Sequence, residues 1–71
     1  MTKVVTAVYD SAGKARNAEN DLIDTGLPRE KVFLDKETNE VKVMTPASGE
    51  GEVTEILNRH DPTEVRCTEA S

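Results

Sequence analysis

The spacing of apolar residues along the chain alternates between a strand-like and a helix-like period. Residues 3–9 (KVVTAVY) are almost continuously apolar and rich in β-branched side chains, which is typical of a strand at the centre of a sheet. Residues 12–25 repeat their apolar positions at steps of three and four, which predicts a helix with one buried stripe. The stripe comprises Ala12, Ala15, Ala18 and Leu22, with Ile23 beside it. The polar positions expected to face away from it are Lys14, Asn17, Asn20, Asp21 and Asp24.

Both ends of this helix carry sequence signals. Asp10 and Ser11 precede it, and their side-chain oxygens can accept hydrogen bonds from the free amide groups of the first turn. Gly26 can adopt the left-handed conformation that ends a helix, and Pro28 cannot continue one. We therefore expect the helix to end at about Thr25.

Two short alternating runs, KVFLD (31–35) and EVKVM (40–44), predict a β-hairpin. The turn between them contains Asn39, a residue type suited to positive φ. A strand period of two turns four paired side chains to one face, in the pairs Leu34–Val41 and Val32–Val43. The same register places on the opposite face Lys31, Phe33, Lys42 and Met44.

A second helix and a last strand complete the pattern. After a loop, apolar residues again share one helical stripe, which begins after Glu52 and ends near His60. The residues of this stripe are Val53, Ile56 and Leu57. An Asp-Pro pair then breaks the helix. Residues 63–68 alternate in polarity, with Val65 and Cys67 as the apolar members, and predict a strand.

The order strand, helix, hairpin, helix, strand is that of the split βαβ, or ferredoxin-like, class of α+β fold. Right-handed crossovers then place both helices on one face of a four-stranded antiparallel sheet, with the first strand between the third and the fourth. The residues expected in the core are Leu22, Val32, Leu34, Val41, Val43, Ile56 and Leu57. The inward side of the first strand stays undecided, because both alternating sets are apolar. One set is Val4, Thr6 and Val8, and the other is Val5, Ala7 and Tyr9.

Length and charge narrow the range of functions. The 71 residues accommodate one small ferredoxin-like domain spanning 1–71 with one hydrophobic core. Fourteen acidic and nine basic side chains give a net charge of −5, which opposes binding to nucleic acid or to anionic membranes. The one cysteine excludes an internal disulfide, and no apolar run is long enough to span a membrane. We expect a cytoplasmic protein without nucleic-acid or membrane partners.

The stretch that begins at Val4 carries a recognisable pattern. A hydrophobic strand ends in an aromatic residue, an Asp and a small residue, and an Ala-rich helix then ends at a glycine before a second strand. The residues of this pattern are Tyr9, Asp10, Ser11, Ala15, Ala18, Leu22, Gly26 and Val32. Over this first half the chain resembles small bacterial general-stress or heat-induced stress protein domains. The resemblance implies a ferredoxin-like fold and a stress-associated role, and it brings no catalytic residues.

Three residues invite comparison with a transition-metal site, namely His60, Asp61 and Cys67. The chain has neither a second thiol nor a second imidazole to complete such a site, so we expect no metal and no cofactor. His60 is expected at the C-terminus of the second helix, where the helix dipole favours a partly positive imidazole. Cys67 is expected to be a small core residue. No catalytic constellation can be assembled, so we expect a protein that is not an enzyme.

Two alternatives involve small ligands. Hydrolases of the acylphosphatase type share the fold and need a basic anion-binding loop after the first strand. Asp10 stands in that loop here and would repel the substrate, so this alternative is disfavoured. A small-molecule or metal-sensing domain that uses the open sheet face or the loop before the second helix remains open.

The uncovered face of the sheet is the candidate protein interface. The hairpin register turns Phe33 and Met44 away from the helices, and apolar patches on small domains commonly mark an interface. Lys31, Lys42 and Arg66 surround this patch and could contact acidic groups of a second copy. The sequence therefore predicts an interaction module that forms a homodimer through this face, with any further protein partner unidentified.

Overall fold

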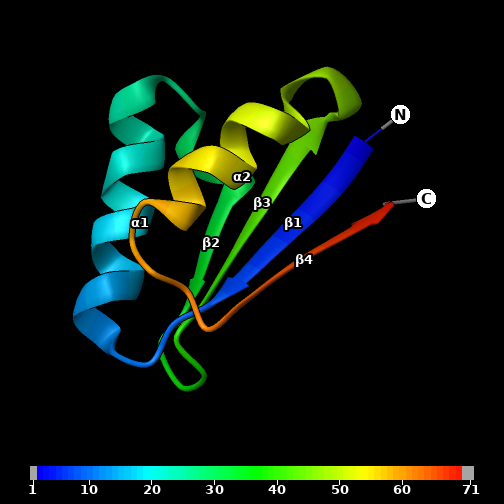
Figure 1. Ribbon diagram of the computed structural model, residues 1–71. Helices are drawn as coiled ribbons and strands as arrows, with labels where there is room; N and C mark the ends of the chain where they lie inside the picture. Colours follow the sequence, from blue (N-terminus) through cyan, green and yellow to red (C-terminus); the bar gives the residue numbers. More distant parts are fainter. Residues whose placement is uncertain (1, 70–71) are drawn as a thin grey trace.

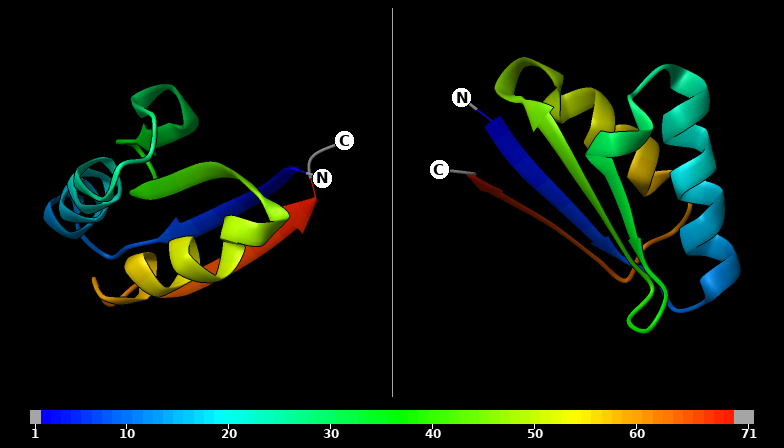
Figure 2. Two further views of the ribbon diagram at one scale, coloured as in Figure 1. Left: turned by 90° about the horizontal axis from the view of Figure 1, so that it is seen from above. Right: turned by 180° about the vertical axis from the view of Figure 1, so that it is seen from behind.

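The computed structural model describes residues 2–69 and has the predicted element order. Its elements are β1 (Thr2–Val8), α1 (Ala12–Thr25), β2 (Val32–Asp35), β3 (Glu40–Pro46), α2 (Glu50–Asn58) and β4 (Glu64–Glu69). Two single-turn 3-10 helices lie at Arg29–Lys31 and Ala47–Gly49. The four strands form one antiparallel sheet in the order β2-β3-β1-β4. Both helices lie on one side of this sheet (Figures 1 and 2), so the predicted ferredoxin-like fold is confirmed.

The strand register shows which side of β1 faces the helices. Val5 pairs with Val43 of β3, and Ala7 pairs with Val41. All four of these side chains are fully buried. The inward set of the first strand is therefore Val5, Ala7 and Tyr9, a choice that the sequence left undecided.

Both termini of α1 carry the predicted caps. The side chain of Ser11 accepts a hydrogen bond from the amide of Lys14 at 3.2 Å. At the other end Gly26 has φ +121°, and its amide donates to the carbonyl of Ile23 at 3.0 Å. The next amide, that of Leu27, donates to the carbonyl of Leu22 at 3.2 Å. This pair of bonds is the Schellman motif, in which a glycine reverses the chain after the last helical turn.

The core between the sheet and the helices matches the predicted set with one exception. Six of the seven predicted residues are buried: Leu22, Val32, Val41, Val43, Ile56 and Leu57. Leu34 is only partly buried and packs against the edge of the core, because β2 is a short edge strand. Ala12, expected on the buried stripe of α1, is exposed at the start of the helix, where the stripe has not yet reached the sheet.

The hairpin has the predicted register and turn. Val32 pairs with Val43 and Leu34 with Val41. Asn39 adopts φ +58°, the positive value for which its side chain is suited. Its carbonyl accepts a hydrogen bond from the amide of Tyr9 at 3.0 Å, which ties the turn to the end of β1.

Within residues 2–69, no helix has both the length and the hydrophobicity that a membrane span requires.

Candidate functional site

The face of the sheet opposite the helices carries three rows of paired side chains. The middle row runs across all four strands and comprises Arg66, Thr6, Lys42 and Phe33. The row toward the hairpin turn is acidic and comprises Glu64, Val8, Glu40 and Asp35. The third row comprises Thr68, Val4 and Met44. This face, which no helix covers (Figure 2), is defined here as the open face.

Phe33 is the most exposed apolar side chain of the open face. Its relative exposure is 49%, and it is the one large hydrophobic side chain classed as exposed in the described part of the chain. Met44, Val4 and Val8 are each partly buried. The apolar part of the face is therefore small and centred between β2 and β1.

The three basic side chains predicted around this patch have different surroundings. Arg66 already contacts acids of its own chain, Glu40 and Glu64, with each nitrogen–oxygen distance at 3.1 Å. Lys42 is exposed in the middle row beside Phe33. Lys31 lies in the 3-10 turn just before β2, one residue outside the strand to which the sequence assigned it.

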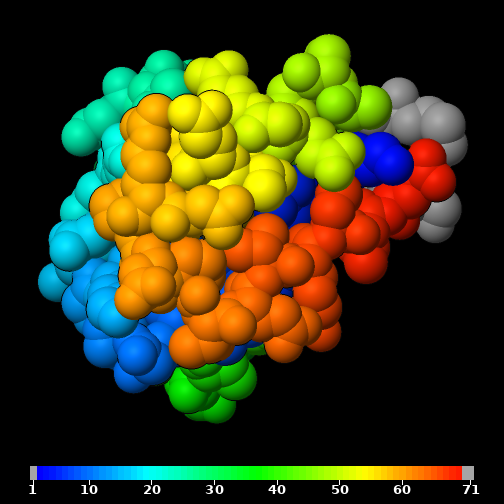
Figure 3. Space-filling view, viewed as in Figure 1, coloured from blue at the N-terminus to red at the C-terminus, as the bar shows by residue number. Residues whose placement is uncertain are grey.

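Cys67 is not the core residue that the sequence predicted. It pairs with Val5 and so belongs to the helix-facing side of the sheet, but it is exposed. The reason is coverage, since α2 has only nine residues and the atoms of β4 stay visible beside it in Figure 3. The carboxylate of Glu50, through a hydrogen bond to the thiol, raises the pKa of Cys67. The raised pKa disfavours the thiolate, which is the nucleophilic form of a cysteine.

His60 connects the two helices. Its Nε2 atom lies 3.0 Å from Oδ2 of Asp21 on α1, and a guanidinium nitrogen of Arg59 lies 3.9 Å from the same carboxylate oxygen. The prediction that Asp21 faces away from the packed side of α1 is therefore wrong, because this carboxylate is partly buried against the residues that follow α2. His60 lies two residues beyond the end of α2, near the predicted end of this helix, and the interaction that its ring makes is with Asp21 of α1.

The loop after β1 is acidic. Lys14 Nζ lies 3.2 Å from Asp10 and 3.4 Å from Asp61, and hydrogen bonds to these two carboxylates raise the pKa of Lys14. One ammonium group thus faces two carboxylates. A phosphate group would meet net negative charge at this loop, which disfavours an acylphosphatase-like activity.

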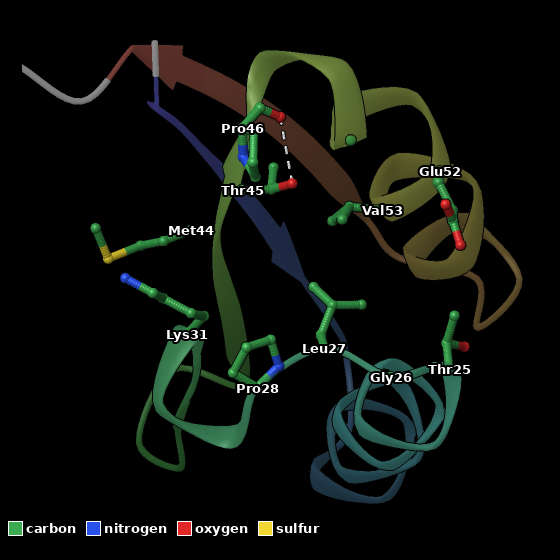
Figure 4. A pocket seen from close by; sticks show the side chains of 11 residues that line it. Thr25, Gly26, Leu27, Pro28, Lys31, Met44, Thr45, Pro46, Glu52 and Val53 are labelled. Carbon is green, nitrogen blue, oxygen red and sulfur yellow. Dashed lines mark hydrogen bonds between the residues drawn. The ribbon is translucent and has the colours of Figure 1, made fainter.

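A pocket of about 370 Å³ opens at the other end of the sheet. The end of α1, the end of β3 and the first turn of α2 form its walls (Figure 4). Leu27 and Val53 lie at its centre, with Thr45 on one side and Glu52 on the other. The sequence indicated only the loop before α2 as a possible ligand site, because the other walls of this pocket come from segments far apart in the chain, each of which looks like an ordinary helix end or strand end.

The described residues contain no group of three or more His, Cys, Asp or Glu side chains placed to hold a metal ion. Comparison with protein-family models, with curated proteins and with solved structures finds no match. The candidate sites of this protein are therefore the open face and the pocket at the start of α2.

Proposed function

We propose that this protein is a non-enzymatic interaction module that forms a homodimer through its open face. The observation that carries the proposal is the exposed Phe33 on a sheet face that no helix covers. A phenylalanine at 49% exposure leaves a large apolar area in water, and burying it against a second copy is favourable. We extend the resemblance of the first half to stress-protein domains into the proposal that the module has a stress-associated role.

The charges of the open face support a second copy as the partner. The middle row carries Lys42 and Arg66, and the neighbouring row carries Asp35, Glu40 and Glu64. A two-fold axis can lie in the plane of contact, perpendicular to the strands and midway between these two rows. Such an axis places the basic row of one copy opposite the acidic row of the other. A surface with both signs side by side is thus complementary to itself, although the whole chain is acidic.

Phe33→Asp tests this proposal. A charged carboxylate would replace the apolar area that the contact buries, so the dimer should dissociate. The fold should persist, because the Phe33 side chain points away from the core. Sedimentation equilibrium at about 100 μM should show a dimer for the unmodified protein and a monomer for the variant. The matched control is Ala12→Asp, which adds the same charge at an exposed position on the helix side and should leave the dimer intact.

Two results would contradict the open-face dimer. One is a monomeric unmodified protein at that concentration. The other is a dimer that survives Phe33→Asp, since the contact would then lie on another surface. Circular dichroism of the variant separates loss of association from loss of folding.

A second candidate function, small-molecule binding, is supported by the pocket at the start of α2. Its volume of about 370 Å³ lies in the range of small-ligand sites, and apolar side chains with a few polar groups line it. The first test is a change in the amide chemical shifts of the pocket residues when small organic molecules are added. Shifts confined to the open face would contradict this candidate.

A further inference from the structure

The pocket at the start of α2 presents hydrogen-bond acceptors on two of its walls. The Thr45 side chain is 4% exposed, and its hydroxyl donates to the carbonyl of Pro46 at 3.3 Å (Figure 4). The Thr25 hydroxyl donates to the carbonyl of Asp21 at 2.8 Å. A hydroxyl has one proton and two lone pairs, so each of these groups can only accept a hydrogen bond from a ligand in the pocket.

The third acceptor is a carboxylate. Glu52 lines the pocket on the same side as Thr25 (Figure 4). None of the ion pairs formed within residues 2–69 includes Glu52. The wall beside it is the C-terminal end of α1, which bears partial negative charge and has no basic side chain in its last turn. This side of the pocket therefore attracts a cation.

The positive charges near the pocket are placed where they offset little of this attraction for a cation. Lys31 stands at the rim beside Met44, and its ammonium group extends away from Glu52 (Figure 4). The first turn of α2 bears partial positive charge, but Glu50 and Glu52 are part of that turn and offset it. The net charge of −5 adds a general attraction for cations.

Building on the small-molecule site proposed above, we infer that its ligand class is a small organic ammonium ion with an apolar body. The ammonium group pairs with the Glu52 carboxylate, on the side of the pocket where the end of α1 adds partial negative charge. The apolar body contacts Leu27 and Val53 at the centre of the pocket.

Three probes with one phenethyl body and different head groups test this inference. They are phenethylammonium, phenethyl alcohol and hydrocinnamate, titrated separately at neutral pH and low ionic strength while amide chemical shifts are followed by NMR. The ammonium probe should bind about tenfold more tightly than the alcohol, and the carboxylate more weakly than either. Shifts should centre on the amides of Leu27, Thr45 and Val53. Added salt should weaken the binding of the ammonium probe and of neither other probe.

Glu52→Gln gives the matched test within the protein. It should weaken phenethylammonium binding by about fivefold and leave phenethyl alcohol unchanged. Glu55→Gln makes the same change on the same helix but outside the pocket, where Glu55 contacts Arg59 at 3.7 Å, and should change neither affinity.

The possible failures are distinguishable. Tighter binding of the alcohol or the carboxylate at the same residues would overturn the ammonium ligand while keeping the pocket as a binding site. The absence of shifts with all three probes would overturn both. Equal effects of the two Glu→Gln variants would mean that general charge, and not Glu52, attracts the amine.

Discussion

Tyr9 belongs to the set of first-strand side chains that faces the helices. Its ring is buried, and its hydroxyl donates a 2.7 Å hydrogen bond to the carbonyl of Leu57 in the last turn of α2. A tyrosine can be buried when its hydroxyl finds such a partner. The sequence could not show this, because Leu57 lies 48 residues further along the chain and the other set of β1 residues is equally apolar.

Removal of this hydroxyl should destabilise the protein in a pH-dependent way. Tyr9→Phe leaves a buried carbonyl without one of its donors and should lower the free energy of unfolding by about 1–3 kcal/mol at neutral pH. Burial raises the pKa of Tyr9 to about 12, whereas the unfolded value is about 10. The proton is therefore held more tightly in the folded state, and this stabilisation is lost as the pH rises from about 10 to about 12.

Urea unfolding of both proteins across this pH range checks the prediction. The stability difference between the unmodified protein and Tyr9→Phe should shrink above about pH 10. A difference that stays constant up to about pH 12 would mean that the Tyr9 hydroxyl is not a buried donor.

Gly26 is the residue whose conformation most restricts substitution. At φ +121° any side chain is strained, although a Cβ atom there would meet no atom within 4 Å. Gly26→Ala should therefore lower the free energy of unfolding by about 1–2 kcal/mol through backbone strain alone.

Gly51→Ala is the control for this prediction. Gly51 lies in α2 with ordinary helical geometry, and a Cβ atom there also meets nothing within 4 Å. This substitution should raise the free energy of unfolding by about 0.5–1 kcal/mol, since alanine can adopt the helical dihedral angles and restricts the unfolded chain more than glycine does. Chemical denaturation of both variants should give opposite signs, and equal signs would contradict the role of Gly26 in the helix end.

At the scale of elements, local signals were sufficient to predict most of the fold. Ser11, Gly26 and Asn39 each act through hydrogen bonds or dihedral angles within a few residues, and their roles were correctly predicted. Errors arose where burial depends on what covers a residue. Cys67 and Leu34 have the right side-chain direction, but α2 is too short to cover β4 and β2 lies at the sheet edge.

The candidate sites also differ in how far they depend on contacts between elements that are distant in the chain. The open face follows from the hairpin register, which is fixed by the period of two. The pocket at the start of α2 depends on how the end of α1 lies against the end of β3, a tertiary arrangement that no local pattern encodes.

Substitution of two leucines compares how much a side chain contributes to the free energy of unfolding at the centre and at the edge of the core. Leu22 of α1 is fully buried, and Leu22→Ala should cost about 2–5 kcal/mol. Leu34 of β2 is only partly buried, so Leu34→Ala removes the same atoms from a less enclosed site and should cost about half as much. Urea unfolding of both variants checks this order. Equal losses would mean that Leu34 is as enclosed in solution as Leu22.

At the scale of the whole molecule, β1 is the structural centre. It pairs with β3 along seven residues and with β4 along six, whereas β2 and β4 each pair with one strand. Amide protons of β1 should therefore exchange with solvent most slowly, and those of β4 faster than those of β3. Native-state hydrogen exchange followed by NMR measures this order. Faster exchange in β1 than in β4 would contradict the strand order.

The outer edge of β4 has a consequence for how this protein avoids aggregation. An edge strand offers free amide and carbonyl groups, which can recruit a strand from another chain and start a fibril. Along β4, Glu64 and Arg66 lie on the open face, and Glu69 shares the opposite face with Val65 and Cys67, so charges stand on both faces of the strand. Another strand laid along this edge would have to bring its own side chains against these charges. The ionised side chains of β4 thus act as gatekeepers that keep the edge hydrated and the sheet at four strands.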